Sequence, residues 1–447
     1  MDAVPPSAPS RADLRPIRLV VTDDCERSRL TVFFRGILAV PHLVWILLWG
    51  VAAFAVAFVV WLAVLFEGRA PRTLHGFIAS YVRYGVHLGA YLALAANPYP
   101  GFTGQPGYPV DVEIDPPQTQ GRWGAGFRLV LAVPALLLAT VLGGGFQGGG
   151  STSVDPGLWT DGTSFGSLGT SIGGVVAIVA LLGWFSCLAR GRMPRGMRDL
   201  AAYAIGYGAQ TYGYALLLTS RYPSSDPSLV HPAELPEHPV RITVTDPLRR
   251  SRLTVFFRLL LALPLFVWAM LWTVAVALAA FLAWLAALAT GRVPRPLQRF
   301  LAAFVRFLAH LDAFVYLVGG PFPGFTGAAG SYPIDVTIEP AGQQRRLVTC
   351  FRLFLAVPAF LLASGYGGVL LVVAVLGWFA ALFTGRMPSG LRDIGAAGVR
   401  YNAQTRAYML LGTDRYPNAT PFLRGKARSE ELALNLELGV DPVGEAT

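Results

Sequence analysis

Three stretches of the chain contain no Asp, Glu, Lys or Arg: residues 36–66, 259–290 and 353–384. A straight helix over each would be roughly 46–48 Å long, whereas the hydrocarbon core of a bilayer is about 30 Å thick. Gly50 and the SGYGG string at 364–368 lie near the middle of two stretches, where a turn would fall. The pattern therefore predicts a helical hairpin, in which two arms are joined by a turn.

Basic residues flank these stretches at both ends. Arg29 and Arg35 come before or at the start of the first stretch, and Arg69 and Arg72 follow it, whereas the expected tips carry no basic residue. Because positive residues mark the cytoplasmic side of a membrane, a hairpin places both ends in the cytoplasm, and a single crossing would place basic clusters on both sides. Each arm has only about 17–19 residues, so a hairpin that enters the membrane without crossing it is the alternative.

A short alternation of apolar and polar residues precedes each apolar segment. It reads IRLVVT at 17–22, VDVEI at 110–114, VRITVT at 240–245 and IDVTI at 334–338. A period of two predicts half-buried strands, and strands with open edges must lie outside the lipid. The second position is arginine in two segments (Arg18, Arg241) and aspartate in the others (Asp111, Asp335). Paired strands would bring these opposite charges face to face or expose them to water.

A third element follows each apolar segment, at about 72–96, 195–219, 295–318 and 389–412. It is apolar but interrupted by pairs such as Arg83 with His87 and Arg306 with His310, which share a helix face because they are four residues apart. This pattern predicts an amphipathic helix in the cytoplasmic interface, and eight crossings in all. If the element also crossed, the count would be twelve. We expect Asp312, inside one of these elements, to pair with a neighbouring arginine.

Internal repeats organise the whole chain. SRLTVFFR occurs at 28–35 and 251–258, and GFTG occurs at 101–104 and 324–327. A GRxP element recurs at 68–71, 191–194, 291–294 and 385–388. The spacings predict four repeat units, at 16–107, 108–238, 239–331 and 332–417. A disordered tail at 1–15 and a cytoplasmic tail at 418–447 enclose them, and a Gly/Ser-rich insertion at 143–174 extends the second unit.

One combination of these features resembles a known family. An apolar double segment that ends LFTGRMP at 382–388, followed by a helix and a closing RYP, is similar to the bacterial membrane family called domain of unknown function 4389. The resemblance covers residues 16–417 in four tandem copies. It implies an integral membrane protein and no particular activity.

Composition also favours a membrane protein. Hydrophobic residues make up 54% of the chain and charged residues 14%, whereas about a quarter of the residues in a soluble domain are charged. The net charge of +10 comes from arginines beside apolar segments, which is typical of a cytoplasmic membrane flank rather than of a nucleic-acid surface. We therefore predict a multi-pass α-helical protein of the plasma (inner) membrane, with both termini cytoplasmic, no cofactor and no nucleic-acid partner.

Eight repeated arginines are the candidate binding residues. Four lie at the starts of the apolar segments and four lie in the GRxP elements. They are Arg35, Arg128, Arg258 and Arg352, and Arg69, Arg192, Arg292 and Arg386. Guanidinium groups suit phosphate, which predicts contacts with anionic lipid headgroups; arginines that only snorkel and set the topology are the more ordinary interpretation. The glycine of GRxP is expected to end one helix, and its proline to open the next.

Catalytic signatures are missing from the sequence. It contains no HExxH, no GxSxG and no nucleotide fingerprint, and Cys25, Cys187 and Cys350 lie too far apart to predict a disulfide scaffold or a zinc site. We therefore expect a non-enzymatic scaffold or accessory membrane component with protein partners that the sequence does not identify. The alternative is a transporter or lipid-handling protein that binds anionic headgroups through its arginines. A membrane enzyme ranks third.

Overall fold

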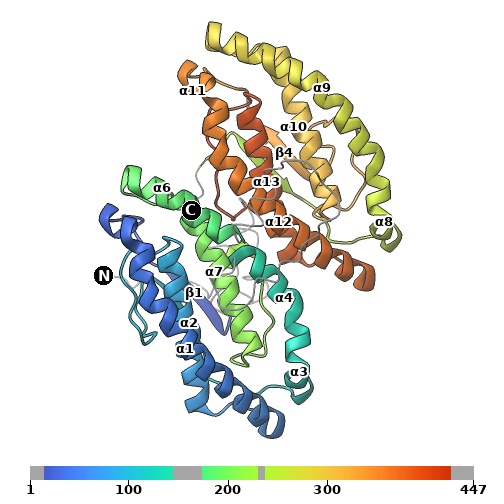
Figure 1. Cartoon of the computed structure of the whole chain (residues 1–447). Coiled ribbons are helices and arrows are strands. Elements are labelled where there is room, and N and C mark those ends of the chain that lie inside the picture. The colour runs from blue at the N-terminus through green and yellow to red at the C-terminus, as the bar shows by residue number, and fades with distance from the viewer. Residues whose placement is uncertain (1–14, 144–173, 230–236, 424–447) are drawn as a thin grey trace, which may run out of the picture.

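The computed structural model describes residues 15–143, 174–229 and 237–423. Within these ranges the chain is mostly helical, with two small sheets, and it folds as two halves of similar design that lie side by side (Figure 1). The predicted insertion and both predicted tails fall almost entirely outside the described residues, so what was predicted for them stays a prediction.

The first half contains two strands and six helices in the described ranges. They are β1 (Ile17–Val21), α1 (Arg29–Glu67), α2 (Arg72–Leu92), β2 (Val110–Ile114), α3 (Arg122–Gly126), α4 (Arg128–Gly143), α6 (Gly174–Arg190) and α7 (Arg195–Ala215). A short 3-10 helix, η1 (Pro227–Leu229), follows. The second half consists of β3 (Val240–Val244), α8 (Arg252–Phe256), α9 (Arg258–Thr290), α10 (Arg295–Val315), β4 (Ile334–Ile338), α11 (Arg346–Cys350), α12 (Arg352–Thr384) and α13 (Ser389–Met409). All four predicted strands are therefore present.

The predicted helical hairpins are wrong for the three uncharged stretches. Each stretch is one continuous helix, of 39 residues in α1 and of 33 residues in both α9 and α12. The glycines that suggested turns lie inside these helices, and Gly50 and Gly365 permit close packing there. A Cβ on Gly50 would lie 3.1 Å from the Tyr81 hydroxyl, and one on Gly365 would lie 2.9 Å from Ile178 Cδ1. Without hairpins, the expected count of eight crossings no longer follows.

Neighbouring long helices within each half run antiparallel. Arg29, at the start of α1, donates a hydrogen bond to the carbonyl of Ala189 near the end of α6, at 3.2 Å. Arg122, just before α4, donates to the carbonyl of Phe66 at the end of α1, at 2.9 Å. The second half repeats this arrangement with α9 and α12. The start of one long helix therefore lies beside the end of its neighbour.

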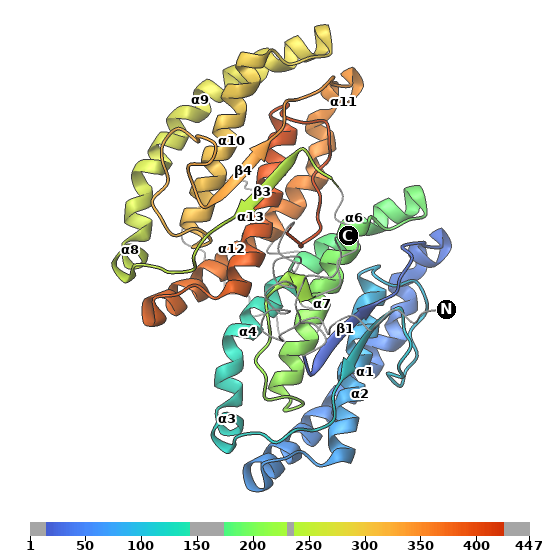
Figure 2. The ribbon, with the colours of Figure 1, turned by 180° about the vertical axis from the view of Figure 1, so that it is seen from behind.

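Each half stacks its elements in the same order. The two strands pair antiparallel, β1 with β2 and β3 with β4. The third elements, α2 with α7 and α10 with α13, pack side by side on these sheets. Figure 2 shows the strands in front of these helices, and the long helices pack on the third elements. The Arg–His pairs of α2 and α10 contact the sheet, which corrects the predicted place of these helix faces in a membrane interface.

The strand register also corrects a prediction. Arg18 lies opposite Glu113, and Asp111 lies opposite Val20, so the Arg18–Asp111 pair, one of the two alternatives, does not form. Asp111 is not solvated either, because it is only 9% exposed. By contrast, the pairing expected for Asp312 is confirmed: its carboxylate lies 2.6 Å from Arg406 of α13.

The apolar long helices are the exposed ones. Of the described helices, α1, α9 and α12 are long and apolar enough to cross a membrane. In the most apolar part of α1 and α9, only 11% and 17% of the residues are buried. The buried share rises to 39% in α12, which packs against α4 and α6 and so joins the two halves. The buried core instead surrounds the third elements.

Candidate functional site

The four arginines at the starts of the long helices are buried. Arg35, Arg128, Arg258 and Arg352 are all 3–4% exposed. Each donates to backbone carbonyls in the last turn of the third element of its own segment or just after it; for example, Arg35 Nη1 lies 2.8 Å from the Tyr91 oxygen. Each guanidinium also lies over an aromatic ring, 4.2–4.7 Å from its centroid. These side chains are therefore held by the protein itself.

A repeated backbone turn presents the carbonyls to these arginines. The third elements end at leucines in the left-handed conformation, with φ between 59° and 62°: Leu94, Leu217, Leu317 and Leu411. Residues with side chains rarely adopt this conformation. The turn closes the helix and leaves carbonyls without helical partners, and the negative end of the helix dipole attracts a cation there. The buried arginine therefore fastens a long helix to its third element.

A second row of side chains supports this contact, and the sequence analysis missed it. Arg27 donates to the Leu94 carbonyl from Nε and Nη2, at 3.0 and 2.8 Å, and forms a buried ion pair with Asp23 at 2.6 Å. Gln120 takes the matching place before Arg128: it donates to the Leu217 carbonyl at 2.7 Å, and its Oε1 accepts from Arg128 at 2.6 Å. The signal was an arginine or glutamine eight residues before the buried arginine.

The GRxP elements behave as expected at their glycines and prolines. The four glycines have φ between 68° and 73°, and the prolines cap the following helices. Their arginines have different surroundings. Arg69 donates to the Pro117 carbonyl at 3.0 Å, Arg192 forms an exposed ion pair with Glu26 at 2.6 Å, and Arg292 and Arg386 are exposed. The structure does not bring all eight candidates together, and their contact with lipid stays a prediction.

A histidine–aspartate pair ties a strand to a helix in each half. His87 Nε2 donates to Asp111 Oδ1 at 2.8 Å, and His310 does the same to Asp335. Burial alone would raise the pKa of both carboxyls, but hydrogen bonds from the histidine and from two backbone N–H groups hold the pKa below its usual value. The carboxylates are therefore ionised anchors for the sheet.

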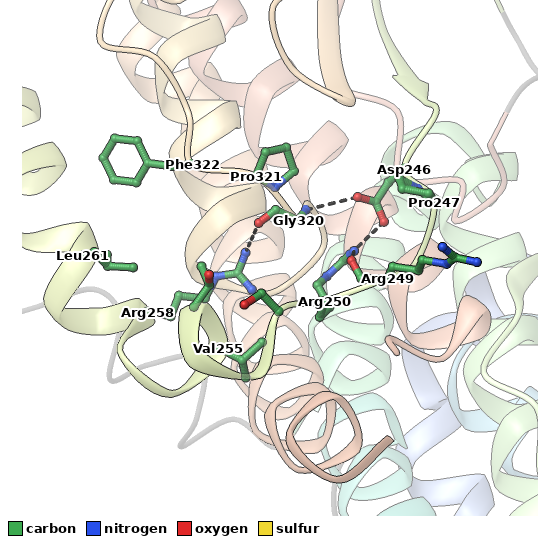
Figure 3. Close-up of a pocket in the computed structure, with 12 residues that line it drawn as sticks. Asp246, Pro247, Arg249, Arg250, Val255, Arg258, Leu261, Gly320, Pro321 and Phe322 are labelled. Atoms are coloured by element: carbon green, nitrogen blue, oxygen red, sulfur yellow. Dashed lines mark hydrogen bonds and ion pairs between the residues drawn. The ribbon is translucent and has the colours of Figure 1, made fainter. Parts of the chain in front are cut away.

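A cavity of about 440 Å³ lies where α8 and the start of α9 meet the loop after α10 (Figure 3). Arginines and an aspartate form one part of its wall, and apolar residues form another. The wall consists of Asp246, Pro247, Arg249, Arg250, Ser251, Thr254, Val255, Arg258, Leu261, Gly320, Pro321 and Phe322. One of the four buried arginines, Arg258, thus borders open space.

The family model "Domain of unknown function (DUF4389)" matches the chain three times, at residues 29–103, 252–324 and 346–420. The chain belongs to this family. Each DUF4389 match contains one of the four buried arginines at the starts of the long helices and one GRxP element. The predicted fourth copy at 108–238 is not among the matches, although Arg128 there makes the same kind of contact. No curated protein and no solved structure matches the chain.

The DUF4389 units show no metal site in the residues that the structure describes: no three His, Cys, Asp or Glu side chains form a set of ligands there. The three cysteines are free, with Cys25 and Cys187 buried and Cys350 exposed. What the arrangement offers chemically is cationic hydrogen-bond donors, mostly occupied by carbonyls and carboxylates. Binding of an anion is therefore the chemistry that this site supports.

Proposed function

We propose that this DUF4389 protein is a non-enzymatic membrane scaffold whose long helices lie along one leaflet of the bilayer, with the sheets on the water side. One observation carries the proposal: the charged sheets lie level with the middle of the long helices.

Contacts at mid-helix connect α1 to the first sheet. Trp49, near the centre of α1, packs on Tyr84 of α2 with ring centroids 5.4 Å apart. Its neighbour Arg83 donates to the carbonyl of Val112 in β2, at 3.1 Å. The second half has the same stack, in which Trp272 of α9 packs on Phe307 and the adjacent Arg306 donates to the Val336 carbonyl at 3.0 Å.

Crossing of the bilayer by α1 or α9 would therefore carry the sheets to mid-membrane depth. Arg18 and Glu113, on the first sheet, have side chains 26% and 59% exposed, and Arg241 and Glu339 on the second are 48% and 45% exposed. Each charge at the bilayer centre costs about 2.5–3.5 kcal/mol or more, and lipid cannot satisfy the open strand edges. Helices lying in the plane of a leaflet avoid both penalties.

Helix length and end charges favour the same placement. The 33-residue α9 is about 50 Å long, which exceeds the roughly 30 Å of the hydrocarbon core. Arg252 lies at one end of it, and Arg292 and Arg295 lie at the other. An arched helix with both ends at the same surface accounts for these charges without a hairpin. Figure 1 shows α9 arched around α10.

The scaffold role and the side of the membrane follow from the same features. Basic residues beside the apolar helices favour the cytoplasmic leaflet of the plasma membrane, which replaces the multi-pass arrangement predicted from hairpins. The outward face of each sheet carries charged residues that water and protein partners can reach. Most of the buried polar groups described above are occupied by structural contacts, which leaves the surface for protein partners.

Cysteine labelling at the two ends of α9 tests the placement. Ser251 is exposed before α8, and Gln343 is exposed beside Gly291 at the far end of α9. The variants Ser251→Cys and Gln343→Cys, each with Cys350→Ser, would be treated with a membrane-impermeant maleimide in right-side-out and inside-out vesicles. The proposal expects both sites to react in the inside-out vesicles alone. Reaction of the two sites from opposite sides would establish a crossing and overturn it.

The scaffold role needs a separate measurement. Native mass spectrometry of the chain, extracted gently from its own membrane, should show a second protein bound at a fixed stoichiometry. A chain that carries no protein partner in this measurement would contradict the scaffold role without affecting the membrane placement.

A further inference from the structure

The cavity at Arg258 is built for an anion, because positive charge there is left without a partner. Arg250 is neutralised by Asp246 at 2.8 Å, and both side chains are almost fully buried. The carboxylate is fully used, since its oxygens also accept from the N–H groups of Leu248 and Gly320, at 3.1 Å each. Figure 3 shows this pair beside Arg258. The aspartate therefore does not compensate the other arginines.

Arg258 itself retains unused donors. Its Nη2 donates to the carbonyls of Gly319 and Gly320, at 2.6 and 3.2 Å. Its Nη1 and Nε are buried and have no hydrogen-bond partner among the described residues. A buried donor without a partner costs about 1–3 kcal/mol, and more when it is charged. An anion entering the cavity would remove that penalty.

The corresponding place in the first unit lacks these features. Arg35 uses both of its terminal nitrogens: Nη1 donates to Tyr91 and Ala96, and Nη2 donates to the Asn97 carbonyl at 3.2 Å. Asn97 stands where the third unit has Gly320. A Cβ added to Gly320 would lie 3.1 Å from Arg250 Nη1 and 3.5 Å from Asp246 Oδ1. Glycine therefore lets the Arg250–Asp246 pair approach this backbone closely, where the first unit has a side chain.

Charge differs between the two places as well. The first unit has three acids and two arginines here, a formal charge of −1: Asp23, Asp24, Glu26, Arg27 and Arg35. The third unit has one aspartate and three arginines, a formal charge of +2: Asp246, Arg249, Arg250 and Arg258. Glu26 pairs with Arg192 of the next GRxP element, whereas its counterpart Arg249 lies in a backbone bridge with Arg386. Neither Arg249 nor Arg386 has an acidic partner within the described part of the chain.

We propose that this cavity binds the phosphate group of a phosphate ester, with Arg258 as the buried donor and Arg249 as the charge at its mouth. Ser251 and Thr254 supply hydroxyl groups on the same wall. Leu261 and Phe322 form an apolar wall away from Arg249 and Arg250 (Figure 3), and they are 38% and 44% exposed. This apolar side fits the glycerol and acyl part of a phospholipid. That the phosphate group belongs to a lipid rests on the proposed membrane placement, whereas binding of a phosphate group in this cavity does not.

Binding to the purified full chain in detergent tests the site without requiring a membrane. Phosphatidylglycerol, diacylglycerol and inorganic phosphate would each be titrated and followed by native mass spectrometry. We expect one phosphatidylglycerol per chain and none of the phosphate-free diacylglycerol. Competition by inorganic phosphate at similar concentration would assign the site to a free phosphate instead of a lipid. Absence of binding by both phosphate compounds would overturn the proposal.

Two substitutions to the first-unit residues test the location. Arg249→Glu with Gly320→Asn should weaken binding at least tenfold, because it reverses one charge and adds a side chain to the cavity wall; loss of one charge-assisted contact is worth about that much. Arg299→Glu makes the same kind of charge reversal at an exposed position near the start of α10, the end of that helix away from the cavity, and should leave binding unchanged. An equal loss in both variants would show that binding follows net charge, and would refute the pocket. This result is independent of the labelling at Ser251 and Gln343.

Discussion

Helices α9 and α13 lie in the same half, but the uncharged helix α9 is the exposed one and the charged helix α13 is the buried one. From its second residue α9 contains no Asp, Glu, Lys or Arg, yet most of its apolar side chains are exposed. Helix α13 contains Arg392, Asp393, Arg400 and Arg406, yet fifteen of its 21 residues are buried. In a protein surrounded by water alone the order would be reversed. The difference indicates that α13 belongs to the protein interior, and the exposed apolar surface of α9 fits the proposed membrane association.

Polar residues are tolerated inside α13 because each has a defined partner. Gln404 Nε2 donates to the Val240 carbonyl of β3 at 2.9 Å, and Arg400 donates to the carbonyls of Thr420 and Phe422. Buried polar groups cost little when they are hydrogen-bonded. The third elements thus form the protein interior, and the long helices form its apolar outside.

The largest effect is expected where α13 is most closely packed. A Cβ on Gly395 would lie 2.7 Å from Val318 Cγ2 and 3.3 Å from Val373 Cγ1. Gly395→Leu should therefore destabilise the fold by about 3 kcal/mol through overpacking, seen as a lower melting temperature in detergent. Leu271→Ala, on a face of α9 where the leucine is 60% exposed, should change it little. Equal losses would show that α9 and α13 are not packed differently.

A smaller effect is expected from the contact that joins the two kinds of helix. Arg35→Gln removes hydrogen bonds from a buried guanidinium of α1 to the carbonyls after α2, and should cost about 2–3 kcal/mol. Arg29→Gln is the matched control on the same helix, since Arg29 is exposed and makes one weaker contact at 3.2 Å. A melting temperature that falls equally in both variants would contradict the fastening role of Arg35.

Local patterns predicted the strands and the helix ends well. VDVEI and IDVTI form β2 and β4 over the expected residues, and the left-handed glycines of GRxP lie where predicted. Such features depend on neighbours within a few residues, because alternation and glycine conformations are local properties. The GRxP arginines are different, since Arg192 finds its partner Glu26 only through the fold.

Features that depend on packing could not be predicted from the pattern of apolar and polar residues. A glycine in an apolar stretch permits either a turn or a close helix contact, and Gly365 makes the contact with α6. The strand register was also missed, because Arg18 had two acidic candidates on one strand, and the fold places it opposite Glu113 rather than Asp111. The cavity at Arg258 depends on Gly320, more than sixty residues away, so no local motif could indicate it.

The smallest effect, and a further contrast between the two kinds of helix, is the response to pH. Helices α2 and α10 hold the sheets through Asp111 and Asp335, whose pKa is lowered from the usual 3.8, whereas α9 contacts α10 through apolar rings such as Trp272 and Phe307.

A carboxyl with a lower pKa in the folded state stabilises the fold above the unfolded pKa, and that contribution is lost as pH falls through the folded pKa. The melting temperature should therefore drop as pH falls below about 4 and through the lowered pKa of the folded state. The drop should be smaller in Asp111→Asn/Asp335→Asn, whereas Glu113→Gln, which removes an exposed carboxylate, should keep the slope of the unmodified chain. The same slope in all three proteins would mean that the histidine–aspartate pairs do not hold the sheets, and that the polar and apolar layers of the molecule respond to pH alike.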